Sequence, residues 1–155
     1  MQVRLAEIQD AEAITATINS AFRKAESFFI DRDRIDAESV RASMEKGQFL
    51  IAEDNGALAG CVYVEQRGEG AYLGLLAVDP ALQRTGIGSA LMNAAENHGS
   101  KMGCRFMDLR IVNLREENHV FYSRRGYVET GIEPFPSNLT PKLPCHFVNM
   151  SKSLR

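Results

Sequence analysis

The feature that most constrains the fold is the segment of residues 75–91, which passes from an apolar run through a glycine-bearing loop into an amphipathic pattern. Leu75 to Val78 is typical of the end of a strand, and Pro80 begins a turn. Beyond Gly86 apolar residues recur at helical spacing, at Ile87, Ala90, Leu91, Ala94 and Ala95. The segment therefore predicts a strand, a loop and a helix whose N-terminus lies at the end of the strand.

Such a helix N-terminus is suited to binding a phosphate, because its unpaired N–H groups carry about +0.5 of an elementary charge. Gly86 and Gly88 would let a pyrophosphate approach the amides of residues 83–89. No lysine follows either glycine, which excludes a P-loop. A dinucleotide-binding fingerprint is also disfavoured, because Leu91 stands where it needs Gly or Ala. Asp108 lies about 20 residues beyond the loop, where that motif has its ribose-binding acid, but it falls in the middle of an expected strand. The remaining alternative is a strand-to-helix connection that binds nothing.

The rest of the chain alternates strand and helix patterns. Strands are expected at residues 3–8, 48–53, 58–65, 71–78, 106–111, 127–130 and 146–150. Helices are expected from an Asp10 cap, over residues 36–46, from Gly86 to about residues 99–103, and from Leu114 to Gly126. Short turns at residues 54–56 and 68–70 predict an antiparallel meander of three strands. Four of the five prolines fall between the last two strands and predict a long ordered or gating loop.

Length and composition favour one globular domain over residues 1–155, with 18 Lys and Arg against 20 Asp and Glu and a net charge of −2. The near-neutral balance argues against a nucleic-acid partner. The apolar runs are far below the roughly 18 residues of a membrane span, and the N-terminus does not resemble a signal peptide, so we expect a cytoplasmic protein. Cys61, Cys104 and Cys145 have no CxxC spacing, which favours buried thiols over a disulfide framework or a metal site.

Two motifs carry a resemblance to a known family. Residues Val78-x-Pro80 followed by Gln83-x-x-Gly86-x-Gly88 resemble the acetyl-CoA loop of the GCN5-related N-acetyltransferase (GNAT) family. The family's later helix ends in aromatic-Tyr-x-x-x-Gly-aromatic, to which the run from Phe121-Tyr122 to Gly126-Tyr127 is similar. The resemblance covers nearly the whole chain. It departs from the family at Arg115 and Asn118, where many members have Asn and Ala.

The resemblance implies an α/β (α+β) fold. The expected GNAT architecture is a mixed, mostly antiparallel sheet of about seven strands flanked by about four helices, in the order β-α-α-β-β-β-α-β-α-β-β. It also implies acetyl-CoA as cosubstrate, with no metal, and direct transfer of the acetyl group to a primary amine of a small molecule or peptide. The implied acetyl-CoA contacts are Leu76, Ala77, Val78, Gln83, Arg84, Thr85, Gly86, Ile87, Gly88, Ser89, Asn118 and Phe121.

Direct attack requires an uncharged amine, a polarised carbonyl and a proton for the departing thiolate. Tyr122 occupies the family's phenol position beside the CoA sulfur and is the expected general acid; the alternative is a core aromatic residue. Backbone amides around Ala77 and Val78 would polarise the carbonyl. The positions where some members carry a base are Tyr72 and Gly74, neither of which is basic at neutral pH.

The base and the acceptor site therefore remain open at this point. Ordered water is the expected base, with Glu65 and Glu69 as hairpin charges and His146 either assisting or structural. The acceptor pocket is expected between the first two helices and the proline-rich loop. Glu26 would bind a cationic amine or simply lie at the surface.

Apolar walls of that pocket would come from Phe28 and Phe29, with Phe135, unless these residues pack in the core. Tyr72 and His146 complete the expected acceptor set. We expect a monomer or homodimer with no nucleic-acid or membrane partner. A non-catalytic CoA-binding sensor or scaffold is the alternative function, and a loop that binds another anion is the third.

Overall fold

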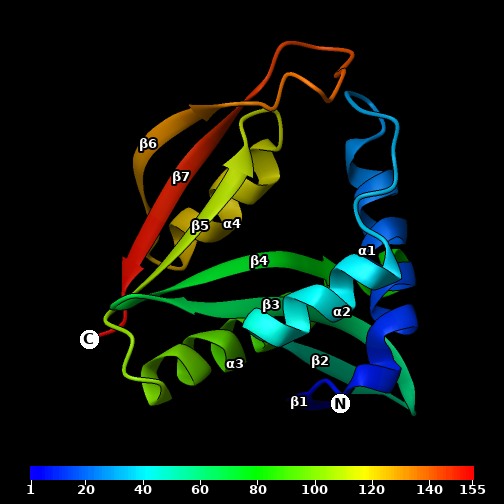
Figure 1. The fold of residues 1–155 in the computed structure, drawn as a ribbon, viewed down its shortest axis with the longest axis vertical. Coiled ribbons are helices and arrows are strands. Elements are labelled where there is room, and N and C mark those ends of the chain that lie inside the picture. The colour runs from blue at the N-terminus through cyan, green and yellow to red at the C-terminus, as the bar shows by residue number, and fades with distance from the viewer.

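One sheet of seven strands, with two helices on each face, forms the framework of the protein (Figure 1). The computed structural model describes all residues from 1 to 155. The strands are β1 (Gln2–Leu5), β2 (Gln48–Asp54), β3 (Ala57–Arg67), β4 (Gly70–Val78), β5 (Phe106–Val112), β6 (Val128–Pro134) and β7 (His146–Ser153). The helices are α1 (Ala11–Glu26), α2 (Ala37–Lys46), α3 (Ile87–Lys101) and α4 (Glu116–Arg124), with short 3-10 turns η1 (Ile8–Asp10) and η2 (Pro80–Leu82).

The strand order is β1-β2-β3-β4-β5-β7-β6, and every neighbouring pair is antiparallel except β4 with β5. The predicted fold, element order and meander are therefore confirmed. β6 is longer than predicted, because it extends to Pro134, a proline expected in the following loop. This proline is tolerated because β6 is an edge strand, where a missing N–H leaves no neighbour unpaired.

β4 and β5 separate soon after they meet. Their parallel pairing is confined to Ala71 with Met107 and Tyr72 with Asp108. Beyond these pairs β4 continues to Val78 and β5 to Val112 without pairing with each other, although each stays paired with its other neighbour. Figure 1 shows the two strands diverging. The sheet is thus open in its middle, between two halves that are each continuously hydrogen-bonded.

Side-chain alternation along the strands divides the apolar residues between two cores. In β2, Phe49 and Ile51 face α1 and α2, whereas Leu50 and Ala52 face α3. Tyr122 of α4 belongs to the core on the α3 face. The two helix pairs therefore cover opposite faces of the sheet, and the opening between β4 and β5 connects these faces. No helix combines the length and the apolar composition needed to cross a bilayer.

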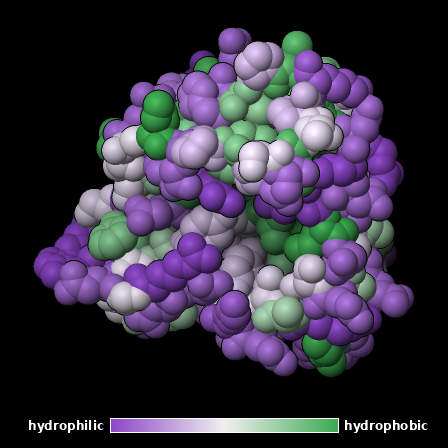
Figure 2. Space-filling view, turned by 45° about the horizontal axis from the view of Figure 1, so that its top comes forward, coloured by the Kyte–Doolittle hydropathy of each residue, from purple (hydrophilic) through white to green (hydrophobic).

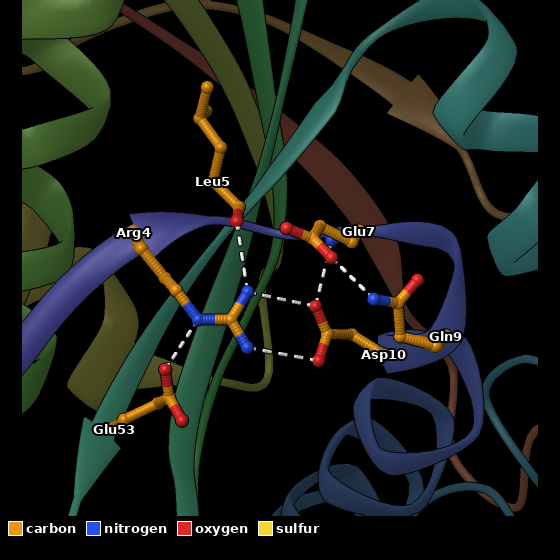
Figure 3. Close-up of polar contacts among 6 residues, drawn as sticks. All are labelled: Arg4, Leu5, Glu7, Gln9, Asp10 and Glu53. Atoms are coloured by element: carbon orange, nitrogen blue, oxygen red, sulfur yellow. Dashed lines mark hydrogen bonds and ion pairs between the residues drawn. The ribbon is translucent and has the colours of Figure 1, made fainter.

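The N-terminal strand is shorter than residues 3–8, because an ionic cluster turns the chain after Leu5 (Figure 3). Both guanidinium Nη atoms of Arg4 donate to the Asp10 carboxylate, at 3.0 and 3.1 Å, and its Nε donates to Glu53 of β2. Asp10 also accepts the N–H of Glu7 at 2.7 Å. Asp10 is the N-cap residue of α1, as predicted, but its carboxylate makes no cap bond to this helix. It binds Arg4 instead, and so joins the start of α1 to β1 and β2.

The long connection between β6 and β7 is ordered against the segment that joins α1 to α2. Lys142 donates its backbone N–H to the Phe29 carbonyl at 2.6 Å, and its Nζ pairs with Asp31 at 2.8 Å. Figure 1 shows the two segments side by side at one end of the molecule. This contact places the proline-rich loop above the same face that α1 and α2 cover.

The cysteines are free thiols, as expected from their spacing. Cys61 and Cys104 are buried and Cys145 is partly buried. Cys61 is fully buried and packs in β3 as a small apolar group, and this burial raises the pKa of its thiol to about 12.

Candidate active site

The predicted strand–loop–helix unit forms with an accessible helix N-terminus. Gly86 is the N-cap of α3 with φ +88° and ψ 1°, a left-handed conformation that favours glycine. No side chain caps this end, so the first N–H groups of α3 lack a side-chain acceptor. A Cβ built on Gly86 would meet no atom within 4 Å, and one on Gly88 would meet only Phe121 and Val78, at 3.8 and 3.9 Å. The loop therefore has space for an anion in front of the helix amides.

The residues of this loop differ in what they offer a ligand. Side chains that reach solvent are those of Gln83, Arg84, Thr85 and Ser89, whereas Ile87 is 5% exposed and packs in the core. Ile87 therefore offers its backbone alone. Gln83 donates its side-chain amide to the Val78 carbonyl at 3.3 Å, which links the loop to the end of β4.

A bulge in β4 shapes the opening of the sheet. The register with β3 shifts between Cys61 and Tyr63, and Leu75 has φ +54°. After the bulge the N–H of Asp79 donates to β3, at 2.8 Å from the Ala59 carbonyl. Because N–H groups alternate along an antiparallel strand, the Val78 N–H faces the opening and the Ala77 N–H faces β3. The expected pair of free amides is thus reduced to that of Val78.

A cleft of about 270 Å³ occupies the divergence of β4 and β5. It is lined by residues from both faces of the sheet, and Figure 2 shows a hollow with apolar residues at its floor and hydrophilic residues at its rim. The predicted site residues that line it are Glu26, Tyr72, Leu76, Ala77, Val78, Gln83, Asn118 and Tyr122.

Tyr122 lies at the α4 side of this cleft. Its ring packs edge-on against Phe121 and Tyr127, with centroid distances of 5.2 and 5.8 Å. Burial raises the pKa of the Tyr122 phenol, and the charge of Arg115 offsets only part of this rise. The hydroxyl is therefore protonated at neutral pH and can donate a proton or a hydrogen bond into the cleft. The side chain serves the core and the cleft together, so the two interpretations made from the sequence are compatible.

Glu26 does not offer a free carboxylate to a cationic ligand. Its Oε2 pairs with Nη1 of Arg115 at 2.9 Å, and the two side chains are only 11% and 13% exposed. Arg115 also pairs with Glu117 at 2.6 Å and approaches the Asn118 amide oxygen at 3.4 Å. The departure from the family at Arg115 is thus explained by this ion pair, which joins the end of α1 to the start of α4.

Three predicted acceptor residues lie outside the cleft. Phe29 is fully buried in a small core with Ile30 and Val112, and Phe28 is 52% exposed. His146 is positioned by its backbone N–H, which donates to Asn113 Oδ1 at 2.8 Å, and its ring does not line the cleft. The third expected wall residue, Phe135, does line the cleft, together with two phenylalanines that were not predicted, Phe22 of α1 and Phe147 of β7.

The hairpin carboxylates are also occupied elsewhere. Glu65 accepts the Tyr63 hydroxyl at 2.7 Å and pairs with Arg67 at 2.6 Å, and Glu69 pairs with Arg105 at 3.6 Å. Glu26 is the only carboxylate among the lining residues, and no histidine lines the cleft. The site therefore holds a proton donor and a free amide but no unpaired side-chain base.

Sequence reasoning missed three arginines that line the cleft, Arg32, Arg34 and Arg110. A signal for the first two was present in the alternation Asp31-Arg32-Asp33-Arg34, which in an extended segment places both arginines on one side. Arg110 is one of the alternating residues of β5 and faces away from the α3 core.

Similarity to known proteins identifies the family and the fold. The acetyltransferase (GNAT) domain family matches residues 45–129, more than half of the chain. The fold is similar to the ribosomal-protein-S18-alanine N-acetyltransferase of Escherichia coli, at 18% identity and TM-score 0.78 over 99% of this chain and 93% of that one. The chain belongs to the GNAT acetyltransferase family.

Two further solved structures share the fold and contain the expected cosubstrate or its product. A putative acetyltransferase of Salmonella typhimurium, determined with acetyl-CoA, is 18% identical with TM-score 0.78, over 99% of this chain and 94% of that one. An aminoglycoside 6'-N-acetyltransferase complexed with coenzyme A is 20% identical with TM-score 0.78, over 100% of this chain and 98% of that one.

Proposed function

We propose that residues 1–155 are a single N-acetyltransferase domain that transfers an acetyl group from acetyl-CoA to a primary amine by direct attack in a ternary complex. The observation that carries the proposal is the position of Tyr122, a buried and protonated phenol in the same cleft as the bulged end of β4. That strand leads directly into the uncapped N-terminus of α3. Family membership supports the same reaction class.

Acetyl-CoA would supply an acyl group bound to a good leaving group. The amides of the α3 N-terminus would bind its pyrophosphate, because Gly86 and Gly88 leave them accessible. Phe121, which lies against Gly88, and Asn118 would bound the path from this loop to the cleft. The other loop and strand residues of the proposed site are Leu76, Ala77, Val78, Gln83, Arg84, Thr85, Ile87 and Ser89.

In the transfer step the Val78 N–H would donate to the acyl oxygen and so stabilise the charge that develops there. Tyr122 would give its proton to the sulfur as the carbon–sulfur bond breaks and the bond from the amine nitrogen to the acyl carbon forms. The proton lost by the amine would pass to ordered water, because the one carboxylate in the cleft is paired with Arg115.

The absence of an unpaired side-chain base in the cleft favours one alternative, a CoA-binding sensor or scaffold of the same fold. The two functions differ in turnover and agree in CoA binding. An assay of both properties on the same protein therefore distinguishes them.

The test compares Tyr122→Phe with Tyr127→Phe in an assay of thiol release from acetyl-CoA over a panel of amines and peptides. Tyr127 is a matched control because its hydroxyl bonds to Glu96 at 2.9 Å, outside the cleft. Tyr122→Phe should lower kcat by roughly 10²–10⁴-fold with little change in CoA binding, the usual size of a general-acid contribution. Tyr127→Phe should retain kcat. Full activity of Tyr122→Phe would refute the acid role, and CoA binding without thiol release on any acceptor would favour the sensor.

A further inference from the structure

The charge of the cleft is opposite in sign to that of the whole chain. Four arginines and one glutamate line it, whereas the chain carries a formal net charge of −2. Two of these arginines have partners: Arg115 pairs with Glu26 at 2.9 Å, and Arg110 approaches Glu133 at 3.6 Å while it stacks over a ring of β7. Arg32 and Arg34 form no ion pair with the protein, so the positive charge of the cleft belongs mainly to them.

The carboxylates nearest in sequence do not neutralise these two arginines. Asp31 pairs with Lys142 at 2.8 Å and Asp33 pairs with Arg23 at 2.5 Å, and both aspartates are more than 60% exposed. The alternation of the segment thus turns its acids to solvent and its two arginines into the cleft.

Arg32 has an unsatisfied polar atom. Its Nε is buried and has no hydrogen-bond partner in the protein, and most buried donors do have one. Arg34 lies with its guanidinium carbon 5.7 Å from the centre of the Phe22 ring. Arg32, Arg34 and Arg110 line the same cleft. Burial lowers the pKa of Arg34, and the charges of Arg32 and Arg110 also lower it, whereas Tyr72 and Glu26 oppose this shift. The one carboxylate of the cleft, Glu26, is paired with Arg115, so Arg32 and Arg34 are two partly desolvated guanidinium groups without an ion-pair partner, which suits them to bind an anion.

The backbone that carries Arg34 is held in place. Asn19 of α1 accepts the N–H groups of Arg34 and Ile35, at 2.8 and 3.0 Å, and donates to the Ile35 carbonyl at 2.8 Å. One amide side chain therefore fixes the loop at three points. The arginine is presented by a preorganised segment, which reduces the entropy lost when a ligand binds.

The arginines lie on the side of the sheet opposite the α3 loop. Arg34 lines the cleft with Tyr72 and Arg110. The neighbours of these two residues, Leu73 and Leu109, pack in the core with α3, so Tyr72 and Arg110 face the other side. Phosphates bound at the α3 N-terminus would be on the far face. An anion at Arg32 and Arg34 would thus enter with the second substrate.

We infer that the acceptor is an amine that also carries a carboxylate, and that Arg32 and Arg34 bind this carboxylate while the amine is directed toward the opening between β4 and β5. The inference rests on the proposed function and names its substrate class. It replaces the expectation of a cationic acceptor bound by Glu26, which is already paired. Each guanidinium presents a planar set of donors that matches the two oxygens of a carboxylate.

The first experiment measures kcat/KM for pairs of acceptors that differ only in the anion, namely amino acids and their carboxamides. The full chain should prefer the carboxylates by about 10–100-fold, the usual effect of hydrogen bonds to charged groups. Arg34→Gln and Arg32→Gln should each reduce this preference at least several-fold without changing the KM for acetyl-CoA. Arg41→Gln is the matched control, since Arg41 is an exposed arginine of α2 outside the cleft, and it should keep the full preference.

Equal or better use of the carboxamides, preference for aminophosphonates over amino acids, or an unchanged preference in both cleft variants would overturn the inference. Turnover of only those amines that carry no anionic group would overturn the inference while leaving the proposed function intact. No thiol release with any amine would instead count against the proposed function.

A binding experiment tests the carboxylate site even without turnover. The melting temperature of the CoA-saturated protein is measured with a set of N-acetylated amino acids and with their carboxamides. A rise that requires the carboxylate and disappears in Arg32→Gln supports the inference, and no carboxylate-dependent rise across the set overturns it.

Discussion

The two sides of the β4–β5 opening are built from different parts of the chain. On the α3 side the site is formed by backbone groups, namely the amides of the helix N-terminus, which Gly86 and Gly88 leave accessible. On the α1 side it is formed by side chains, with Arg32 and Arg34 unpaired and Glu26 bound to Arg115. A backbone site suits any ligand that contains the same phosphates, whereas a side-chain site varies with the residues present. From this contrast we expect the α3 side to recognise the cosubstrate and the α1 side to select the acceptor.

The backbone side is tested most severely by Gly86→Asp, which has the largest expected effect. The carboxylate would repel the pyrophosphate and occupy its space. In the unaltered protein, CoA at a hundred times its Kd should stabilise the fold by about 2.7 kcal/mol and raise the melting temperature, and this rise should disappear in the variant. Gly56→Asp is the matched control: Gly56 also has positive φ, +78°, and an open environment, but lies in the β2–β3 turn. Both variants share the backbone strain, and only the first should lose the CoA response. Retention of that response in Gly86→Asp would contradict the placement of the phosphate.

This division also explains what could be predicted from the sequence. The α3 side depends on contiguous residues, so the spacing of Gln83, Gly86 and Gly88 was sufficient to predict the loop, and alternating patterns were sufficient for the sheet. The α1 side depends on contacts between distant segments. The pairing of Glu26 with Arg115 spans 89 positions, and no local pattern indicates it.

The same limit applies to the misplaced residues. Phe28 and Phe29 are adjacent in sequence, yet one is exposed and the other is fully buried because the proline-rich loop docks beside them. Leucine does not favour the positive φ found at Leu75, so the bulge follows from pairing with β3 rather than from local preference. Local backbone devices are readable in one sequence, and side-chain partners brought from afar are not.

The side-chain side is tested next by Glu26→Gln. This change leaves the largely buried Arg115 beside a neutral group, which lowers the free energy of unfolding. Because Glu117 still pairs with Arg115, we expect a loss of about 2 kcal/mol, somewhat less than for breaking a fully buried pair. Arg23→Gln provides the comparison on the same helix, because the Arg23–Asp33 pair is more than 60% exposed and should contribute under about 1 kcal/mol. Denaturant unfolding measures both. Equal losses for the two variants would show that burial of the Glu26–Arg115 pair has no energetic consequence.

The smallest expected effect is at the other end of α1, where the Arg4–Asp10 ion pair holds the start of this helix against the sheet. The hydrogen bonds of Arg4 hold the pKa of Asp10 below its usual value. This carboxylate therefore contributes its full stabilisation above its unfolded pKa of about 3.9 and loses it as the pH falls through the lower folded pKa. Asp10→Asn should cost about 1 kcal/mol at pH 7 and flatten the loss of stability below pH 4, as followed by thermal unfolding from pH 7 to pH 2.5.

Asp36→Asn is the control at pH 7, because Asp36 caps α2 through the Ser39 N–H and asparagine caps as well. Amide hydrogen exchange in Asp10→Asn shows which part of the molecule the Arg4–Asp10 pair stabilises. A rise confined to α1 and its connection to α2 would show that the α1 side of the site can open locally while the α3 side stays closed. An equal rise in α1 and α3 would show that the pair does not stabilise the α1 side specifically.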